Sequence, residues 1–243
     1  MLTAKGYFAI AQIEDLVIAP YLDQRGTLTW GIGHTDATKR APKVNTMPTF
    51  TPINIDGVIR EAWNVFCADV EPYERAVEAV LPGLKPHEKD GWVMWHFNTG
   101  GLSKTKAVAK WKAGDKAGAV AVLQQWNKVT IKGEKLVSDG LVKRRQQEAD
   151  MILKGVYPGG TLDVYRTDGN RHIVWSPKIA SYDIDEWHKF IGYVPEPAPR
   201  RVALPKISTD AKGGGIVAAV IAAAAAIIAG GIALLEKIQG FLQ

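Results

Sequence analysis

Cysteine is almost absent from this chain of 243 residues, in which Cys67 stands alone. A single cysteine cannot form an internal disulfide, so the fold does not depend on an oxidising compartment. Cys67 lies among apolar neighbours in the stretch "EAWNVFCADVEPYERAV", which has the periodicity of an amphipathic helix. We therefore expect a buried, unreactive thiol there and not a catalytic nucleophile.

Metal-binding patterns are also missing. The zinc motif His-Glu-x-x-His puts two ligands on one face of a helix. No such spacing occurs among the five histidines, His34, His87, His96, His172 and His188. The sequence therefore disfavours a zinc-dependent amidase, and we expect neither a metal nor another cofactor.

Two further absences concern partners and export. The net charge of +5 suits an anionic partner such as a cell-wall polymer or lipid headgroups. No nucleic-acid motif and no dense stripe of Lys and Arg are present, so we expect no nucleic-acid partner. The first residues, "MLTAKGYFAIAQIEDL", lack the apolar stretch and the small-residue cleavage site of a secretory signal, so we expect no N-terminal signal peptide.

The composition of the chain predicts three parts. These are a globular domain over residues 1–155, a small extension or linker over 156–212, and a hydrophobic segment with a short tail over 213–243. Since 47% of the residues are hydrophobic, the chain can bury a sizeable core and is not disordered as a whole.

The first part combines early strands with later helices. Apolar spacing predicts a short helix over residues 5–14, and "APYLDQRGTLTWGIGHT" predicts a β-hairpin that turns at Asp23–Gly26. Helical patterns then follow over 54–81 with a break or kink at Pro72, over 85–101 with a glycine C-cap, over 106–126 and over 141–153. We expect an α+β fold, mainly α, with a small β-hairpin subdomain beside a helical lobe.

The second part, residues 156–212, carries one local signal. Asp168-Gly169 in "LDVYRTDGNRHIVWS" predicts the turn of a β-hairpin. This part either binds the cell wall or serves as a folded spacer, and the sequence slightly favours the spacer.

The third part contains a hydrophobic segment, "IVAAVIAAAAAIIAGGIALL", at residues 216–235. Twenty uncharged residues are enough to cross a bilayer core of about 30 Å, so we expect a C-terminal membrane helix, and its small residues suit self-association. The basic residues that precede it favour a cytoplasmic catalytic domain; they are Arg200, Arg201, Lys206 and Lys212. The chain then either waits in the cytoplasm or at the inner membrane for release, by a holin-type pore or by membrane collapse, or engages a membrane from outside.

The chemistry is concentrated in "IEDLVIAPYLDQRGTLTWGIGHTDA", residues 13–37. Hydrolysis of a glycosidic bond needs one protonated carboxyl group and one ionised carboxylate across a cleft. Glu14 follows an apolar segment, which predicts a raised pKa and the role of acid, whereas Asp23 lies in a polar turn. Thr29 follows on the next strand, where its hydroxyl can hold a water. On spacing alone, a surface Glu and an ordinary turn Asp remain an equal alternative.

The same stretch resembles the signature of the phage-type lysozymes, a muramidase family of phage endolysins and related bacterial enzymes. The matching residues are Glu14, Tyr21, Asp23, Gly26, Thr29, Gly31, Gly33, His34 and Thr35. Asp15 departs from the pattern, because the family usually has Gly there, and we expect its side chain to point to solvent. Further similarity in "HFNTGG", "WKAGD" and "DGLVKRRQQEADMIL" extends the resemblance over residues 7–154.

The resemblance implies an endolysin-type muramidase that cuts the β-1,4 bond between N-acetylmuramic acid and N-acetylglucosamine in peptidoglycan. It assigns the general acid to Glu14, the second carboxylate to Asp23 and the water-positioning hydroxyl to Thr29. It also implies inversion, for which the two carboxyl groups stand roughly 6.5–9.5 Å apart. The alternative that keeps the fold is a membrane-anchored protein that binds peptidoglycan or helps to assemble it.

Five other residues are candidates for substrate binding or support of the site. His34 is expected to anchor the hairpin, and Trp30 is the tryptophan best placed to stack on a sugar. Asn98 either binds substrate or caps its helix. Arg144 or Arg145 either reaches the carboxylate of Glu14 or lies on a solvated helix face.

Overall fold

The computed structural model describes residues 1–23, 26–48, 54–131 and 133–192. The hydrophobic segment at 216–235 lies outside the described residues. Within the described residues, none of the helices has both the length and the apolar character needed to span a bilayer.

A helix and a hairpin form at the start of the chain as the sequence predicts. Helix α1, Ala4–Glu14, begins at Thr3, whose hydroxyl accepts a hydrogen bond from the amide of Gly6. Strand β1, Leu16–Leu22, then pairs with β2, Leu28–Gly31, and β2 pairs with β3, His34–Thr35, both antiparallel. Strand β1 therefore leads directly from the end of α1 to the hairpin turn.

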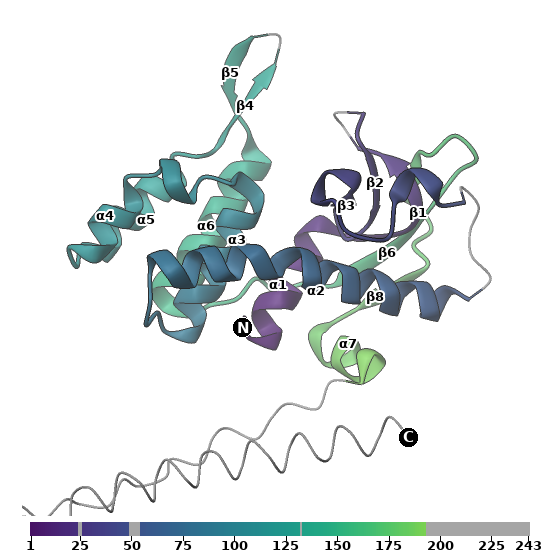
Figure 1. Ribbon diagram of the computed structural model, residues 1–243, viewed down its shortest axis with the longest axis horizontal. Helices are drawn as coiled ribbons and strands as arrows, with labels where there is room; N and C mark the ends of the chain where they lie inside the picture. Colours follow the sequence, from purple (N-terminus) through teal and green to yellow (C-terminus); the bar gives the residue numbers. More distant parts are fainter. Residues whose placement is uncertain (24–25, 49–53, 132, 193–243) are drawn as a thin grey trace, which may run out of the picture. The chain divides into compact units, whose positions relative to one another are not determined.

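The middle of the chain is helical. It consists of α2, Ile55–Val80, α3, Pro86–Thr99, α4, Ala107–Lys112, α5, Lys116–Gln124, and α6, Asp139–Lys154. Helix α3 ends as predicted at Gly100, which has a left-handed φ of 61°. In Figure 1, helix α2 runs from the strands at one end to the group formed by α3 to α6 at the other. The fold is lysozyme-like, α+β and mostly helical.

The predicted break at Pro72 is wrong, because α2 is continuous from Ile55 to Val80. Proline has no amide hydrogen, so residue 72 cannot donate to the carbonyl of Ala68 one turn earlier. Arg40 supplies the missing donor from another part of the chain: its Nη1 donates to the carbonyl oxygen of Ala68 at 2.7 Å. The carbonyl of Ala68 thus keeps a donor, and α2 continues past Pro72 without a break.

A hairpin that the sequence analysis missed projects from the helical lobe (Figure 1). Strands β4, Lys128–Ile131, and β5, Glu134–Val137, pair antiparallel with each other and lie apart from the main sheet. Their side chains are almost all exposed, including those of Ile131, Leu136 and Val137.

The extension expected from residue 156 begins with the predicted hairpin, but the hairpin is part of the main sheet and not of a separate domain. Strand β6, Leu162–Thr167, turns into β7, Ile173–Val174, and is followed by β8, Ala180–Tyr182, and helix α7, Ile184–Ile191. Strand β6 pairs parallel with β1, so the main sheet has the order β3-β2-β1-β6-β7, with β8 also paired to β6.

The domain boundary expected at residue 155 is therefore contradicted by the structure. One compact unit runs from Met1 through α7. Val164 of β6 and Trp187 of α7 belong to the same buried cluster as Phe66 of α2 and Trp92 of α3. The ring of Trp187 also packs against Trp63 of α2, with centroids 5.0 Å apart. Shared burial of large apolar side chains joins this region to the rest of the core.

We predict that Arg40 matters to stability because of Pro72. Replacing Arg40 by Met leaves the carbonyl of Ala68 without its donor and should lower the free energy of unfolding by about 1–2 kcal/mol. In a Pro72→Ala background the amide of residue 72 bonds that carbonyl, so the cost of Arg40→Met should fall by about 1 kcal/mol. Urea unfolding of the four chains measures this coupling. An equal cost in both backgrounds would contradict the explanation.

Candidate active site

Glu14 is the last residue of α1, and its carboxylate meets a guanidinium group from α6. Glu14 Oε1 lies 2.7 Å from Arg144 Nη2, with the Glu14 side chain 26% exposed and that of Arg144 only 9% exposed. A methyl group placed on Gly33 would lie 3.9 Å from the other oxygen, Oε2, so the β2–β3 turn approaches the carboxylate closely. The wholly apolar setting expected from the sequence is thus wrong, because the main partner of Glu14 is a cation.

Arg144 is held by a buried network that links α6 to α3. Glu148 lies with one oxygen 3.6 Å from Arg144 Nε and the other 2.8 Å from Arg145 Nε. Burial raises the pKa of Glu148 to about 7, and the two guanidinium groups oppose that rise. Arg145 Nη2 donates to Asn98 Oδ1 at 2.7 Å. Arg144, and not Arg145, therefore reaches Glu14, while Asn98 and Arg145 hold the two helices together.

Asp23 follows β1 at the hairpin turn. Its Oδ1 accepts a hydrogen bond from the amide of Thr27 at 2.7 Å, and its own amide donates to the carbonyl of Thr27 at 3.0 Å. Gly26 completes the turn with a φ of 75°, a conformation that glycine adopts without strain. The turn fixes the carboxylate of Asp23 beside the start of β2.

Thr29 lies directly opposite Tyr21 in the antiparallel pair, so the two side chains share a face of the sheet. The hydroxyl of Thr29 donates to the carbonyl of Thr27 at 3.1 Å, which leaves its oxygen available as an acceptor. Burial raises the pKa of Tyr21, and the negative charges of Glu14 and Asp23 raise it further.

Trp30 and His34 lie inside the protein and support the hairpin. The indole of Trp30 is buried and donates to the carbonyl of Ile18 at 3.3 Å, so it offers no open ring face to a sugar. His34 is buried as well, with Nδ1 at 2.6 Å from Asp69 Oδ2 and Nε2 at 2.9 Å from the carbonyl oxygen of Pro42. His34 thus has the anchoring position that the sequence favours.

Asp15 does not point to solvent as expected. It is partly buried and has φ 58° and ψ 170°, a conformation that costs a residue with a side chain about 1–3 kcal/mol. Burial raises the pKa of Asp15 to about 6, helped by the charge of Asp163 and opposed by that of Lys178. The residue beside Glu14 thus faces the β6 region.

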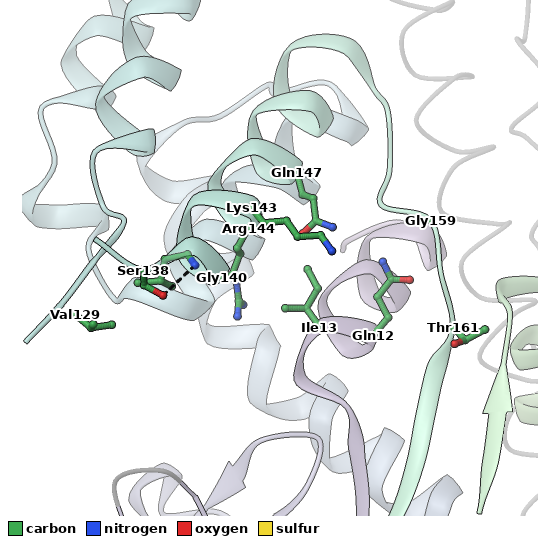
Figure 2. Close-up of a pocket in the computed structure, with 11 residues that line it drawn as sticks. Gln12, Ile13, Val129, Ser138, Gly140, Lys143, Arg144, Gln147, Gly159 and Thr161 are labelled. Atoms are coloured by element: carbon green, nitrogen blue, oxygen red, sulfur yellow. Dashed lines mark hydrogen bonds between the residues drawn. The ribbon is translucent and has the colours of Figure 1, made fainter. Parts of the chain in front are cut away.

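Two adjoining cavities lie on the helical side of the site, where Arg144 lines one and Asn98 lines the other, whereas Glu14, Asp23 and Thr29 line neither. One, of about 510 Å³, lies between α1, the first turns of α6 and the segment that leads into β6. Figure 2 shows Lys143 and Gln147 pointing from α6 toward Gln12 of α1, with Thr161 on the far side. A second cavity, of about 990 Å³, lies along Asn98, Trp126 and the β4–β5 hairpin.

Both cavities are lined by Val129 and Leu141, so the two adjoin each other. Sequence analysis missed the lining by Gly159 and Thr161, because only the β1–β6 pairing brings those residues to α1. Among the described residues, no group of three or more His, Cys, Asp or Glu side chains is arranged to hold a metal ion.

Comparison with known proteins identifies a family and several relatives of this chain. A family model described as phage lysozyme matches residues 11–148. A SAR-endolysin of Pseudomonas phage phiKMV is 31% identical over 147 residues, which cover 60% of this chain and 84% of that protein. A SAR-endolysin of Escherichia phage Mu is 29% identical over 143 residues, which cover 58% of this chain and 74% of that protein.

Solved structures give the same result. An endolysin from Escherichia coli O157:H7 phage FAHEc1 superimposes with a TM-score of 0.56 at 32% identity, covering 65% of this chain and 96% of that one. The muramidase domain of SpmX from Asticaccaulis excentricus has a TM-score of 0.53 at 20% identity, over 63% of this chain and 99% of that domain, and shows a likeness of fold alone. The family model and the endolysin relatives define a glycosidase of the lysozyme class. The chain belongs to the phage lysozyme family.

We predict that the charge of Asp15 destabilises the fold at neutral pH. Its folded pKa of about 6 lies above the ordinary value of 3.8, so the penalty is absent at low pH and grows as the pH rises through 6. Asp15→Asn should therefore raise the free energy of unfolding above pH 6, by about 1–2 kcal/mol after allowance for solvent screening, and the gain should vanish near pH 4.

Asp168→Asn is the matched control of opposite sign. Hydrogen bonds from the amides of His172 and Asn170 lower the pKa of Asp168, so its substitution should reduce stability at neutral pH and lose that effect in acid. Urea unfolding of both variants from about pH 2 to about pH 8 measures the two trends. A gain from Asp15→Asn that does not change with pH would contradict the assignment.

Proposed function

We propose that this chain is an endolysin-type muramidase that hydrolyses the β-1,4 bond between N-acetylmuramic acid and N-acetylglucosamine in peptidoglycan and thereby lyses the bacterial wall. The observation that carries the proposal is the position of Glu14, held by Arg144, at one end of β1 and of Asp23 at the other. Membership of the phage lysozyme family and the endolysin relatives support it.

Glu14 acts as the general acid in this proposal. Arg144 fixes one oxygen of its carboxyl group, while the other lies on the side of the β2–β3 turn. As the bond between the anomeric carbon and the glycosidic oxygen breaks, the proton of Glu14 passes to that oxygen, which becomes the hydroxyl of the leaving sugar.

Asp23 and Thr29 act on the attacking water. The oxygen of Thr29 accepts one hydrogen of the water, because its own hydrogen is already donated to Thr27. Asp23 takes the other proton as the water oxygen bonds to the anomeric carbon from the opposite face. This sequence inverts the configuration at that carbon, in contrast to a mechanism with a covalent glycosyl–Asp23 intermediate.

A binding or assembly protein of the same fold is the alternative. It has no need of an acid held by an arginine, nor of a carboxylate and a hydroxyl on the strands beside it. The presence of Glu14, Asp23 and Thr29 in these positions favours the enzyme.

Delivery to the wall forms the second part of the proposal. The hydrophobic segment at 216–235 anchors the chain in a membrane, with the catalytic unit in the cytoplasm until a holin-type pore or membrane collapse releases it. Self-association through Gly230-Gly231 is a further expectation. Protease access to the catalytic unit in intact cells tests the orientation: protection supports it, and early cleavage supports engagement from outside.

Substitution of Glu14 tests the catalytic assignment. Glu14→Gln keeps the size of the side chain but has no proton to donate, so lysis of outer-membrane-stripped cells should fall by about 10²–10⁴-fold. Turbidity loss and the appearance of new reducing ends measure the reaction. Glu61→Gln, an exposed carboxylate on α2, is the matched control and should lyse like the wild type. Equal lysis by the Glu14 variant, or lysis without reducing ends, would contradict the proposal.

A further inference from the structure

The β6–β7 hairpin widens the face of the sheet that carries the candidate active site. Parallel pairing sets Val17 of β1 beside Tyr165 of β6. Val17, Tyr21 and Tyr165 form one buried cluster, against which Ile173 of β7 also packs. Thr29 is directly opposite Tyr21, so the Tyr21 cluster joins Thr29 of β2 to Ile173 of β7 across a register irregularity between Val17 and Tyr21.

The hairpin is fixed at both of its ends to the catalytic strand. The carbonyl of Arg171, in its turn, accepts a hydrogen bond from the amide of Leu22 at 3.1 Å, directly before Asp23. At the other end, Thr161 lines the same cavity as Arg144. The added hairpin therefore contacts β1 at its start, through Leu16 and Val17, and at its end, through Leu22.

An exposed tryptophan stands at the outer margin of this face. Trp175 follows β7, and continuation of the β6–β7 register places it opposite Tyr165. The two rings meet edge to face with centroids 5.0 Å apart, which fixes the orientation of the indole. Trp175 is nevertheless 60% exposed, although burial of an indole is strongly favourable. A held aromatic ring with an open face is a ready surface for the apolar side of a sugar.

Polar groups surround the two rings. Asp163 accepts hydrogen bonds from Lys178 at 2.5 Å, from Ser181 at 2.5 Å and from Thr161 at 2.9 Å. The hydroxyl of Tyr165 also donates to Asp163 at 3.3 Å. An aromatic surface beside fixed hydroxyl and ammonium groups has the character of a carbohydrate subsite, in which a few polar groups orient the ligand.

We infer that the β6–β7 hairpin forms an outer subsite for the glycan strand of peptidoglycan, with Trp175 as its stacking platform. Strands lie about 4.8 Å apart and rise about 3.3 Å per residue, so Trp175 is roughly 15 Å across the sheet and roughly 13 Å along it from Thr29, a separation that a polysaccharide spans and a single sugar does not. The inference rests on the proposed muramidase function and extends its binding site. It gives the region after residue 155 a role in holding long substrates.

Kinetics with substrates of two lengths test this subsite. Trp175→Ala should raise KM for long soluble glycan strands, freed of their stem peptides, by about five- to tenfold, with kcat unchanged. For a tetrasaccharide too short to reach the hairpin, KM should stay as in the wild type. Trp175→Phe keeps a ring and should recover most of the affinity. Val156→Ala, at another exposed apolar side chain, is the matched control and should have no effect.

A binding measurement separates this inference from the proposed function. Isothermal titration of the same long strands into the Glu14→Gln chain needs no turnover, and adding Trp175→Ala should raise Kd by about the same factor. If the wild-type chain shows no lysis but glycan strands still bind in a way that depends on Trp175, the proposed function is contradicted and the subsite is supported. Unchanged Kd and KM, equal losses for the tetrasaccharide, or no binding of strands at all would overturn the subsite. Unaltered thermal unfolding of Trp175→Ala confirms that the variant is folded.

Discussion

The parallel pairing of β6 with β1 is the constraint on which the rest of the site depends. Strand β1 begins two residues after Glu14 and ends directly before Asp23, so its position sets the positions of both carboxylates. Pairing of Leu16 with Val164 and of Val17 with Tyr165 holds the edge of β1 that β2 does not cover. An edge strand without such a partner leaves its backbone groups open to solvent or to other chains.

The second constraint is electrostatic and comes from the helical lobe. Arg144 contacts Glu14 from α6, and Glu148 and Arg145 connect that contact to Asn98 on α3. Such buried charges are costly to desolvate and are retained only with several partners each. The network thus fixes the carboxylate of Glu14, the proposed acid, from the side of the helical lobe, while β1 fixes the positions of both carboxylates from the side of the sheet.

Local sequence signals predicted local structure well. Helix α1, the β1–β2 hairpin, the end of α3 at Gly100 and the hairpin at Asp168-Gly169 all follow from capping, alternation and turn chemistry. The errors at Pro72, at residue 155 and at Trp30 share one cause, because each depends on a contact with another segment. Arg40 bonds the carbonyl that Pro72 leaves open, and β1 pairs with β6 beyond residue 155. Trp30 donates to the carbonyl of Ile18 in the neighbouring strand. The family resemblance named Glu14, Asp23 and Thr29 as candidates and left Arg144 and Arg145 as possible partners of Glu14, between which the structure selects Arg144.

Thermal unfolding of a chain ending at residue 155, compared with one ending at residue 192, tests most directly whether β6 to α7 belong to the catalytic unit. The shorter chain loses Trp187, whose removal alone is worth about 3–5 kcal/mol, together with the partner strand of β1. Domains are stable by only about 5–15 kcal/mol. We therefore expect the thermal midpoint of the shorter chain to be lower by roughly 10–20 °C, or its cooperative transition to be absent, and its lytic activity to be lost. Equal midpoints and equal lysis by the two chains would show that residues 156–192 are an appendage and would contradict the account.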